Sequence, residues 1–209
     1  MTILKKAAMF GLDARIALAI FGALSVISGA ALYSAIQKSQ VVSFYTSFNE
    51  VVKASEAYLL DTGSFIKTSA ASSDTMAIRL LGENTDSDPS WSGPYLPYPV
   101  KSEHELEYTF LGNAYSLLIK EHPGVWTTAE NAFPEACDGS TTACYEWISL
   151  YANSVAESNE VVRLFNALDK EYDNSDGYNV GNVRHKKIAS GNTYRIYIKG
   201  MLKGSGNPS

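Results

Sequence analysis

The feature that most constrains this chain is a proline-free stretch from Met9 to Leu60. Its first part, Ile16 to Ile36, contains no charged residue, and about 20 apolar residues are enough for a helix to cross the core of a bilayer. Its second part places apolar residues at the three- and four-residue spacings of an amphipathic helix. Gly63 follows as a C-terminal stop signal. We therefore expect one helix of about 50 residues, roughly 75 Å long.

The residues before this stretch indicate how the chain is oriented in a membrane. Residues 1–8 contain Lys5 and Lys6, and positive charge before an apolar segment keeps that end in the cytoplasm. A secretory signal peptide would have its cleavage site after the apolar region, and we find no convincing site there. Cleavage after Ala8 would instead make Met9 the new N-terminus and Asp13 its fifth residue.

This arrangement resembles the N-terminus of the type IV pilin and type II secretion pseudopilin superfamily. The resemblance implies that prepilin peptidase cuts between Ala8 and Met9 and that Met9 is then N-methylated. It also implies that Asp13 replaces the family's usual fifth-residue glutamate and pairs with the amino terminus of a neighbouring subunit. A carboxylate near the membrane is unfavourable unless it is paired, which agrees with that role.

The chain also departs from the family pattern. The family usually has glycine before the cut, where this chain has Ala8, and Arg15 is unusual so early in the apolar segment. A cut after Gly11 would restore the glycine but would place Ile16 fifth and lose the acid. The alternative interpretation is that Asp13 and Arg15 merely flank an ordinary signal anchor.

Two further strings resemble the major pseudopilin of type II secretion. One is W-x-G-P-Y-L, from Trp91 to Leu96, and the other is Y-x-x-D-x-G, from Tyr58 to Gly63. The first is also consistent with a simple turn in which Gly and Pro bend the chain and the aromatic residues pack on a core.

Composition and cysteine content agree with a head outside the cytoplasm. The chain has 209 residues and a net charge of −5, and loss of the two leader lysines would make the charge more negative. Nucleic-acid-binding domains are usually basic, so we do not expect nucleic acid as the main partner. The only cysteines, Cys137 and Cys144, should form a disulfide in an oxidising compartment.

The remaining pattern predicts an α+β, pilin-like fold: a long helix, its first half transmembrane, packed on a small antiparallel sheet, with extra helices and a disulfide loop in the head. Residues 105–111 and 114–119 are expected to form a hairpin, and 193–199 a third strand. Residues 145–151 are expected to form a short apolar helix, and 158–168 a second helix.

The acidic turn that follows the second helix is a candidate calcium site. Asp169, Asp173 and Asp176 fall within eight residues, and calcium prefers several carboxylate and carbonyl oxygens on a flexible loop. Major secretion pseudopilins as a family bind calcium in a similarly placed loop. The spacing is not that of an EF-hand. Ordinary turn and helix-end roles are the alternative for these acids.

No catalytic motif was found. The chain lacks G-x-S-x-G, H-E-x-x-H, Walker and dinucleotide-binding patterns. We interpret His104, His122 and His185 as surface residues, and a nucleophile such as Ser72 or Cys144 has no identifiable base. We therefore do not expect an enzyme.

The sequence accordingly predicts a leader at 1–8, a long helix at 9–62 whose residues 14–36 form the membrane or fibre core, and a head at 63–209. The expected function is that of a structural subunit of a type IV pilus-like or secretion pseudopilus filament. Its expected partners are other copies of itself, prepilin peptidase, an inner-membrane assembly platform and the membrane. The head would be periplasmic or extracellular. The alternative is a membrane-anchored periplasmic binding module that does not polymerise.

Overall fold

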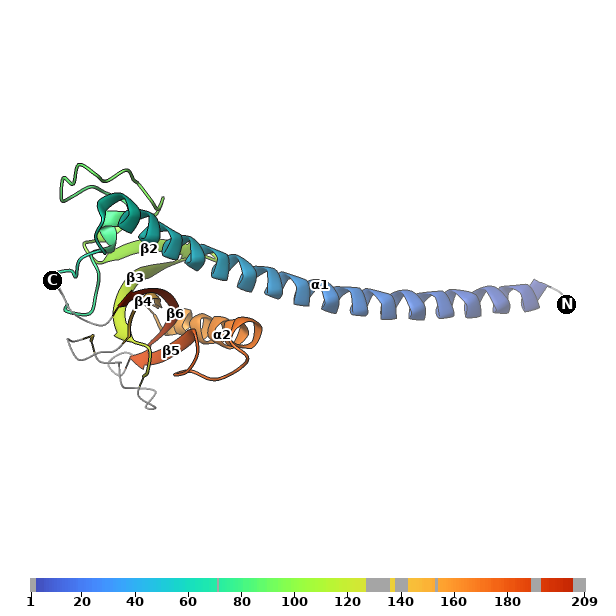
Figure 1. Ribbon diagram of the computed structural model, residues 1–209. Helices are drawn as coiled ribbons and strands as arrows, with labels where there is room; N and C mark the ends of the chain where they lie inside the picture. Colours follow the sequence, from blue (N-terminus) through green and yellow to red (C-terminus); the bar gives the residue numbers. More distant parts are fainter. Residues whose placement is uncertain are drawn as a thin grey trace. The chain divides into compact units, whose positions relative to one another are not determined.

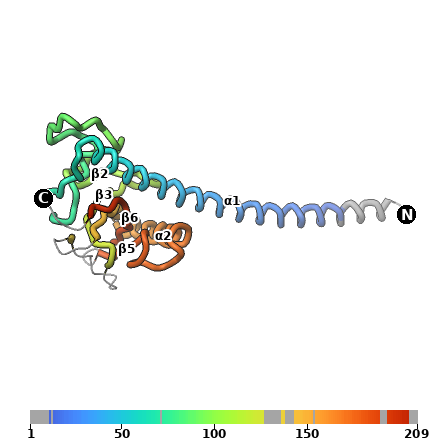
Figure 2. The backbone as a smooth tube through the Cα atoms, in the orientation of Figure 1, coloured from blue at the N-terminus to red at the C-terminus, as the bar shows by residue number. Residues whose placement is uncertain are grey.

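The computed structural model describes residues 3–70, 72–126, 136–137, 143–152, 154–188 and 193–204, without the side chains of residues 3–10 and 12 (Figure 2). It divides into two compact units, Met1–Ser43 and Phe44–Ser209, which are considered separately here. The elements are α1 (Ile3–Thr62), a 3-10 helix η1 (Ile78–Leu81), β1 (Val100–Ser102), β2 (Glu105–Phe110), β3 (Asn113–Pro123), β4 (Cys144–Tyr151), α2 (Val155–Tyr172), β5 (Val183–Ile188) and β6 (Thr193–Gly204).

The long helix predicted from the sequence is present and extends further at both ends. It covers the expected range from Met9 to Leu60 and is 60 residues long. The helix ends where the glycine signal placed its end: the Gly63 N–H donates to the Leu59 carbonyl at 2.9 Å, with φ of +71° at Gly63. Gly63 adopts the left-handed backbone conformation that closes the last turn, and it does so at little steric cost because glycine has no side chain.

The helix begins at Ile3, so the expected leader is part of it. In the first unit, the side chains of the charge-free segment are exposed. The large apolar side chains that are exposed there are Ile16, Leu18, Ile20, Phe21, Leu24, Val26, Ile27, Leu32, Tyr33 and Ile36.

In the second unit, the head is an α+β structure built on one antiparallel sheet of six strands in the order β1-β2-β3-β4-β6-β5 (Figure 1). The expected hairpin is β2 and β3, with Leu106 opposite Leu117 and Phe110 opposite Asn113. The predicted strand near residue 193 is β6, and it lies between β4 and β5. The sheet therefore has twice the number of strands that the sequence suggested.

The predicted helix over residues 145–151 is wrong. These residues form strand β4, whose neighbours are β3 and β6. The physical reason is a two-residue period: Trp147 and Ser149 point to one face of the sheet, while Ile148 and Leu150 point to the other. Aromatic and β-branched residues suit that pleated surface. The second predicted helix is present as α2 and is longer than expected, beginning after the N-cap Ser154.

Both helices cover the same face of the sheet (Figure 1). The second half of α1 packs Phe44 against Phe110, with ring centroids 5.2 Å apart, and α2 packs Phe165 against His185 on β5 at 4.2 Å. The aliphatic core between them comes from the central strands: Leu117, Ile119, Ile148, Leu150, Ile196 and Ile198.

Candidate functional site

The exposed apolar part of α1, which includes Ile16 to Ile36, stands apart from the buried core of the head. α1 is the one helix among the described residues that is long and apolar enough to cross a membrane, and its most apolar window is not buried at all. Contiguous exposed apolar surface on this scale marks a site of interaction with a membrane or another protein. The segment could therefore serve as a membrane anchor.

The residues expected to act in processing and assembly lie on this part of α1. The Ala8–Met9 peptide bond is inside the helix, and the side chains of both residues fall outside the described ones. Asp13 and Arg15 are both exposed. Cleavage, methylation and pairing of Asp13 with a neighbouring subunit remain predictions.

The three acids of the candidate calcium site come together at the end of α2. Asp169 lies in the last turn of that helix, Asp173 caps its C-terminus, and Asp176 lies in the turn beyond. One carboxylate oxygen from each lies within 4.8 Å of those from the other two. Asp169 and Asp173 are buried, and Asp176 is exposed.

Backbone geometry holds these acids together. Asn174 and Ser175 both have φ of +58°, so the chain reverses tightly between Asp173 and Asp176. The Asp173 carboxylate accepts hydrogen bonds from the backbone N–H groups of Asn182 at 2.6 Å and Val183 at 2.7 Å. Asp173 therefore has a structural role as well, because it fixes the start of β5.

The electrostatic surroundings of the three acids favour a cation, but the acids alone supply too few ligands for calcium. Burial, followed by the charges of Asp173 and Asp169, raises the pKa of Asp176, so a positive ion would relieve repulsion. Gly181 closes the site: a side chain there would collide with the carboxylate oxygens of Asp173 and Asp176. Calcium takes six to eight oxygen ligands, so three carboxylates would have to be completed by other oxygens.

Arg184 places a fixed positive charge near the same acids. Burial lowers the pKa of its guanidinium to about 10, although Asp173 and Asp176 oppose that shift. The guanidinium donates to the carbonyls of Gly181 and Gly124, each at 2.9 Å. These hydrogen bonds of Arg184 thus go to backbone carbonyls and not to the carboxylates. Arg184 therefore offsets the negative charge of the acids only partly.

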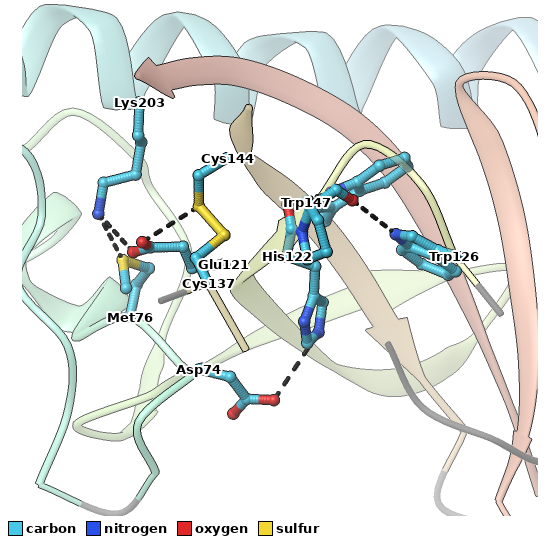
Figure 3. Close-up of a disulfide and its surroundings, with 10 residues drawn as sticks. Asp74, Met76, Glu121, His122, Trp126, Cys137, Cys144, Trp147 and Lys203 are labelled. Carbon is cyan, nitrogen blue, oxygen red and sulfur yellow. Dashed lines mark hydrogen bonds and ion pairs between the residues drawn. A yellow bond between two sulfur atoms is a disulfide. The ribbon is translucent and has the colours of Figure 1, made fainter. Parts of the chain in front are cut away.

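The predicted disulfide is confirmed. Cys137 and Cys144 are joined with a Cα–Cα distance of 6.0 Å (Figure 3). Cys144 is the first residue of β4, and its sulfur lies 3.2 Å from a Glu121 carboxylate oxygen on β3. Lys203 on β6 pairs with the other Glu121 oxygen at 2.7 Å. The disulfide is therefore tied into three neighbouring strands, and Cys144 has no free thiol for nucleophilic chemistry.

A second polar cluster, which the sequence did not indicate, surrounds Asp74. Lys120 donates to its Oδ1 at 2.9 Å, and Thr75 does the same at 2.9 Å. Nε2 of the buried His122 lies 3.7 Å from Oδ2 (Figure 3). Burial would raise the pKa of Asp74, but hydrogen bonds from Ser72 and Lys120 outweigh that effect and hold the pKa well below its usual range.

The expectation that the histidines are surface residues is wrong for two of them. His122 is fully buried and packs edge-on against Trp126, and His185 is buried against Phe165. Their flanking charged residues suggested exposure, but strand alternation turns each ring into the head. Near His122, the Ser72 hydroxyl donates to the Asp74 carboxylate. In a catalytic triad the serine would instead donate to the histidine, and the histidine to the acid.

Comparison of the chain with protein-family models, with curated proteins and with solved structures finds no match in any of the three.

Sequence reasoning therefore found the acidic turn and the disulfide but missed three residues that shape the head. Gly181 carries a positive φ of 70° and could have been suspected from the run of turn residues around it. Asp74 and Lys120 are 46 positions apart, and no local pattern connects them.

Proposed function

We propose that this chain is a structural subunit of a type IV pilus-like or type II secretion pseudopilus filament. In this proposal prepilin peptidase removes residues 1–8, and the mature chain is inserted once in the inner membrane with a periplasmic or extracellular head. Subunits then associate through the first half of α1 at an inner-membrane assembly platform. The pilin-like fold of the head is part of the same proposal.

The observation that most supports this proposal is the continuity of α1. A helix whose first half exposes apolar side chains on all sides continues without a break into a half that packs one face on an antiparallel sheet. A simple anchor needs only about 20 residues. An extended helix that also forms part of the head's core suits a filament subunit better than a simple anchor.

Processing tests the proposal first. We expect intact-mass analysis of the membrane-extracted protein to give a mature N-terminus at Met9 carrying an N-methyl group. A mass that retains residues 1–8, or a cut after Ala30 or Ala31, would contradict the filament proposal and favour a non-polymerising membrane-anchored binding module.

Assembly tests it second. Asp13→Ala should leave the melting of the head unchanged and greatly reduce filament yield after shearing and electron microscopy, because a neighbour's amino group would lose its partner. Asp13→Glu is the matched control, since it keeps the charge and should retain assembly. A normal yield from Asp13→Ala would rule out the pairing.

We also propose that the turn of Asp169, Asp173 and Asp176 holds calcium, supported by the converging carboxylates and by the close approach to them that Gly181 permits. Calcium at a hundredfold excess over its dissociation constant should stabilise the head by about 2.7 kcal/mol. Asp176→Asn should remove most of that gain, whereas magnesium, which demands stricter octahedral geometry, should give less. Melting curves identical with and without calcium would mean that the turn is structural only.

A further inference from the structure

Glu146 on β4 is a fully buried acid beneath the second half of α1. Its exposed fraction is 0%, and it lies on the same helix-covered face of the sheet as Ile148 and Leu150. Packing here is close: a Cβ added to Gly200 on β6 would lie 3.1 Å from the Glu146 carbonyl oxygen and 3.4 Å from Val52 on α1. The backbones of β4 and β6 therefore lie close to α1 beside Glu146.

The Glu146 carboxyl group has no hydrogen-bond partner among the described residues. This holds for both of its oxygens, and the buried hydroxyl of Ser55 on α1 is in the same position. Burying an ionised carboxylate without partners is strongly unfavourable, and such a group takes up a proton instead. The geometry alone therefore favours the neutral acid.

The charged groups around Glu146 come from three elements. Lys203 on β6 favours its ionised form, as does the nearby Ser55 hydroxyl, which lies close enough to stabilise the charge although it does not reach hydrogen-bond geometry; Glu121 on β3 and Glu56 on α1 oppose ionisation. Lys203 is already paired with Glu121 at 2.7 Å, so the negative charge of Glu121 offsets much of its attraction for an ionised Glu146. Burial is the largest effect, and together these effects raise the pKa of Glu146 to about 7.

We propose that Glu146 is a proton-operated latch: as a neutral acid it lets residues 51–58 of α1 pack on the sheet, and its ionisation loosens that packing. The head is then most tightly closed in acidic surroundings. The proposal is independent of filament assembly, because every group that it uses lies in the unit Phe44–Ser209.

The sign of the pH dependence follows from linkage. Glu146 has an ordinary value of 4.5 and a folded pKa of about 7, so the folded head binds more protons than the unfolded chain between these limits. Stability should fall as pH rises through that window and level off above it. A surface carboxylate stabilised by a partner would give the opposite slope.

The test compares the full-length protein in detergent with the variant Glu146→Gln, which keeps the shape of the neutral acid. Between about pH 5 and about pH 8.5, the melting temperature of the unmodified head should fall by about 5 °C more than that of Glu146→Gln. Amide exchange of residues 51–58, corrected for its intrinsic pH dependence, should accelerate over the same range only when Glu146 is present. Glu107→Gln, on the opposite face of the sheet, is the matched control and should behave like the unmodified protein.

A second measurement does not depend on how well Glu146→Gln folds. The infrared carbonyl band of a protonated carboxylic acid should persist in the unmodified protein up to near-neutral pH. Its midpoint should move to lower pH in Glu56→Gln and to higher pH in Lys203→Met, because these variants remove a repulsive and an attractive charge. Parallel melting profiles for the unmodified protein and Glu146→Gln, or the absence of a protonated carboxyl band near pH 6, would overturn the latch.

Discussion

The two halves of α1 have the same backbone structure and opposite surroundings. Phe21 in the first half is 70% exposed, whereas Phe48 in the second half is 1% exposed. The first half has apolar side chains on every side, and the second half has them on one stripe that meets the sheet. One continuous helix can therefore suit both an apolar environment, such as a membrane, and the core of the head. Its backbone hydrogen bonds are satisfied within the helix in both surroundings.

This contrast shows where the stability of the head originates. Residues of the second half are part of the same core as β2 and β3, through contacts such as Phe44 with Tyr108, whose centroids are 6.1 Å apart. The large apolar side chains between Ile16 and Ile36 are instead exposed. We therefore expect substitutions of these exposed residues to leave the unfolding of the head unchanged.

The largest expected effect is that of Phe48→Ala, compared with Phe21→Ala. Removing a fully buried phenylalanine costs about 3–5 kcal/mol, because transfer energy is lost and a cavity remains. Phe21→Ala should leave the unfolding of the head unchanged. Thermal or denaturant unfolding of the full chain in detergent, followed by near-ultraviolet circular dichroism, measures both. Equal losses for the two variants would break the comparison.

An intermediate effect is expected where the second half of the helix ends. Gly63→Ala forces a side chain into the left-handed region and should destabilise the head by about 1–2 kcal/mol. Gly29→Ala lies in the first half, where an added Cβ meets nothing within 4 Å, and the same measurement should detect no loss. A neutral Gly63→Ala would mean that the helix end can unwind without involving the core.

The smallest effect concerns Tyr45, which stacks on Tyr172 of α2 with centroids 3.9 Å apart. Tyr45→Leu should cost about 0.5–1.5 kcal/mol, the part of the interaction that is specific to an aromatic pair. Tyr33→Leu is the control, since Tyr33 is 67% exposed. A clear loss of head stability in Tyr33→Leu would show that the boundary between the halves lies nearer the N-terminus.

The sequence predicted those parts of the fold that local patterns determine. The long helix follows from a proline-free stretch closed by Gly63, and the β2–β3 hairpin follows from alternation around Gly112. The turn itself falls one residue earlier than expected, with positive φ at Leu111 and Gly112. Strand β4 was missed because a short apolar run between turn residues fits a helix or a strand until its neighbours are known.

The candidate site was predictable to the same extent. Asp169, Asp173 and Asp176 are close in sequence, so their proximity needed no knowledge of the fold. The burial of Glu146 and the pairing of Asp74 with Lys120 depend on strands and loops that are far apart in the chain. Charged residues are normally exposed, and only tertiary structure reverses that expectation for Glu146 and Lys120, which are buried, and for Asp74, which is half-buried.

The position of β6 between β4 and β5 also sets an order in time. A ribosome makes α1 first and reaches Gly204 only after the rest of the head has been made, a delay on the order of ten seconds at ordinary elongation rates. Until then β4 lacks one neighbour and β5 has none, so the sheet cannot close. During that interval the part of α1 that packs beside β6, such as Val52 near Gly200, is uncovered, and the nascent head should be most vulnerable to proteases and most in need of chaperones.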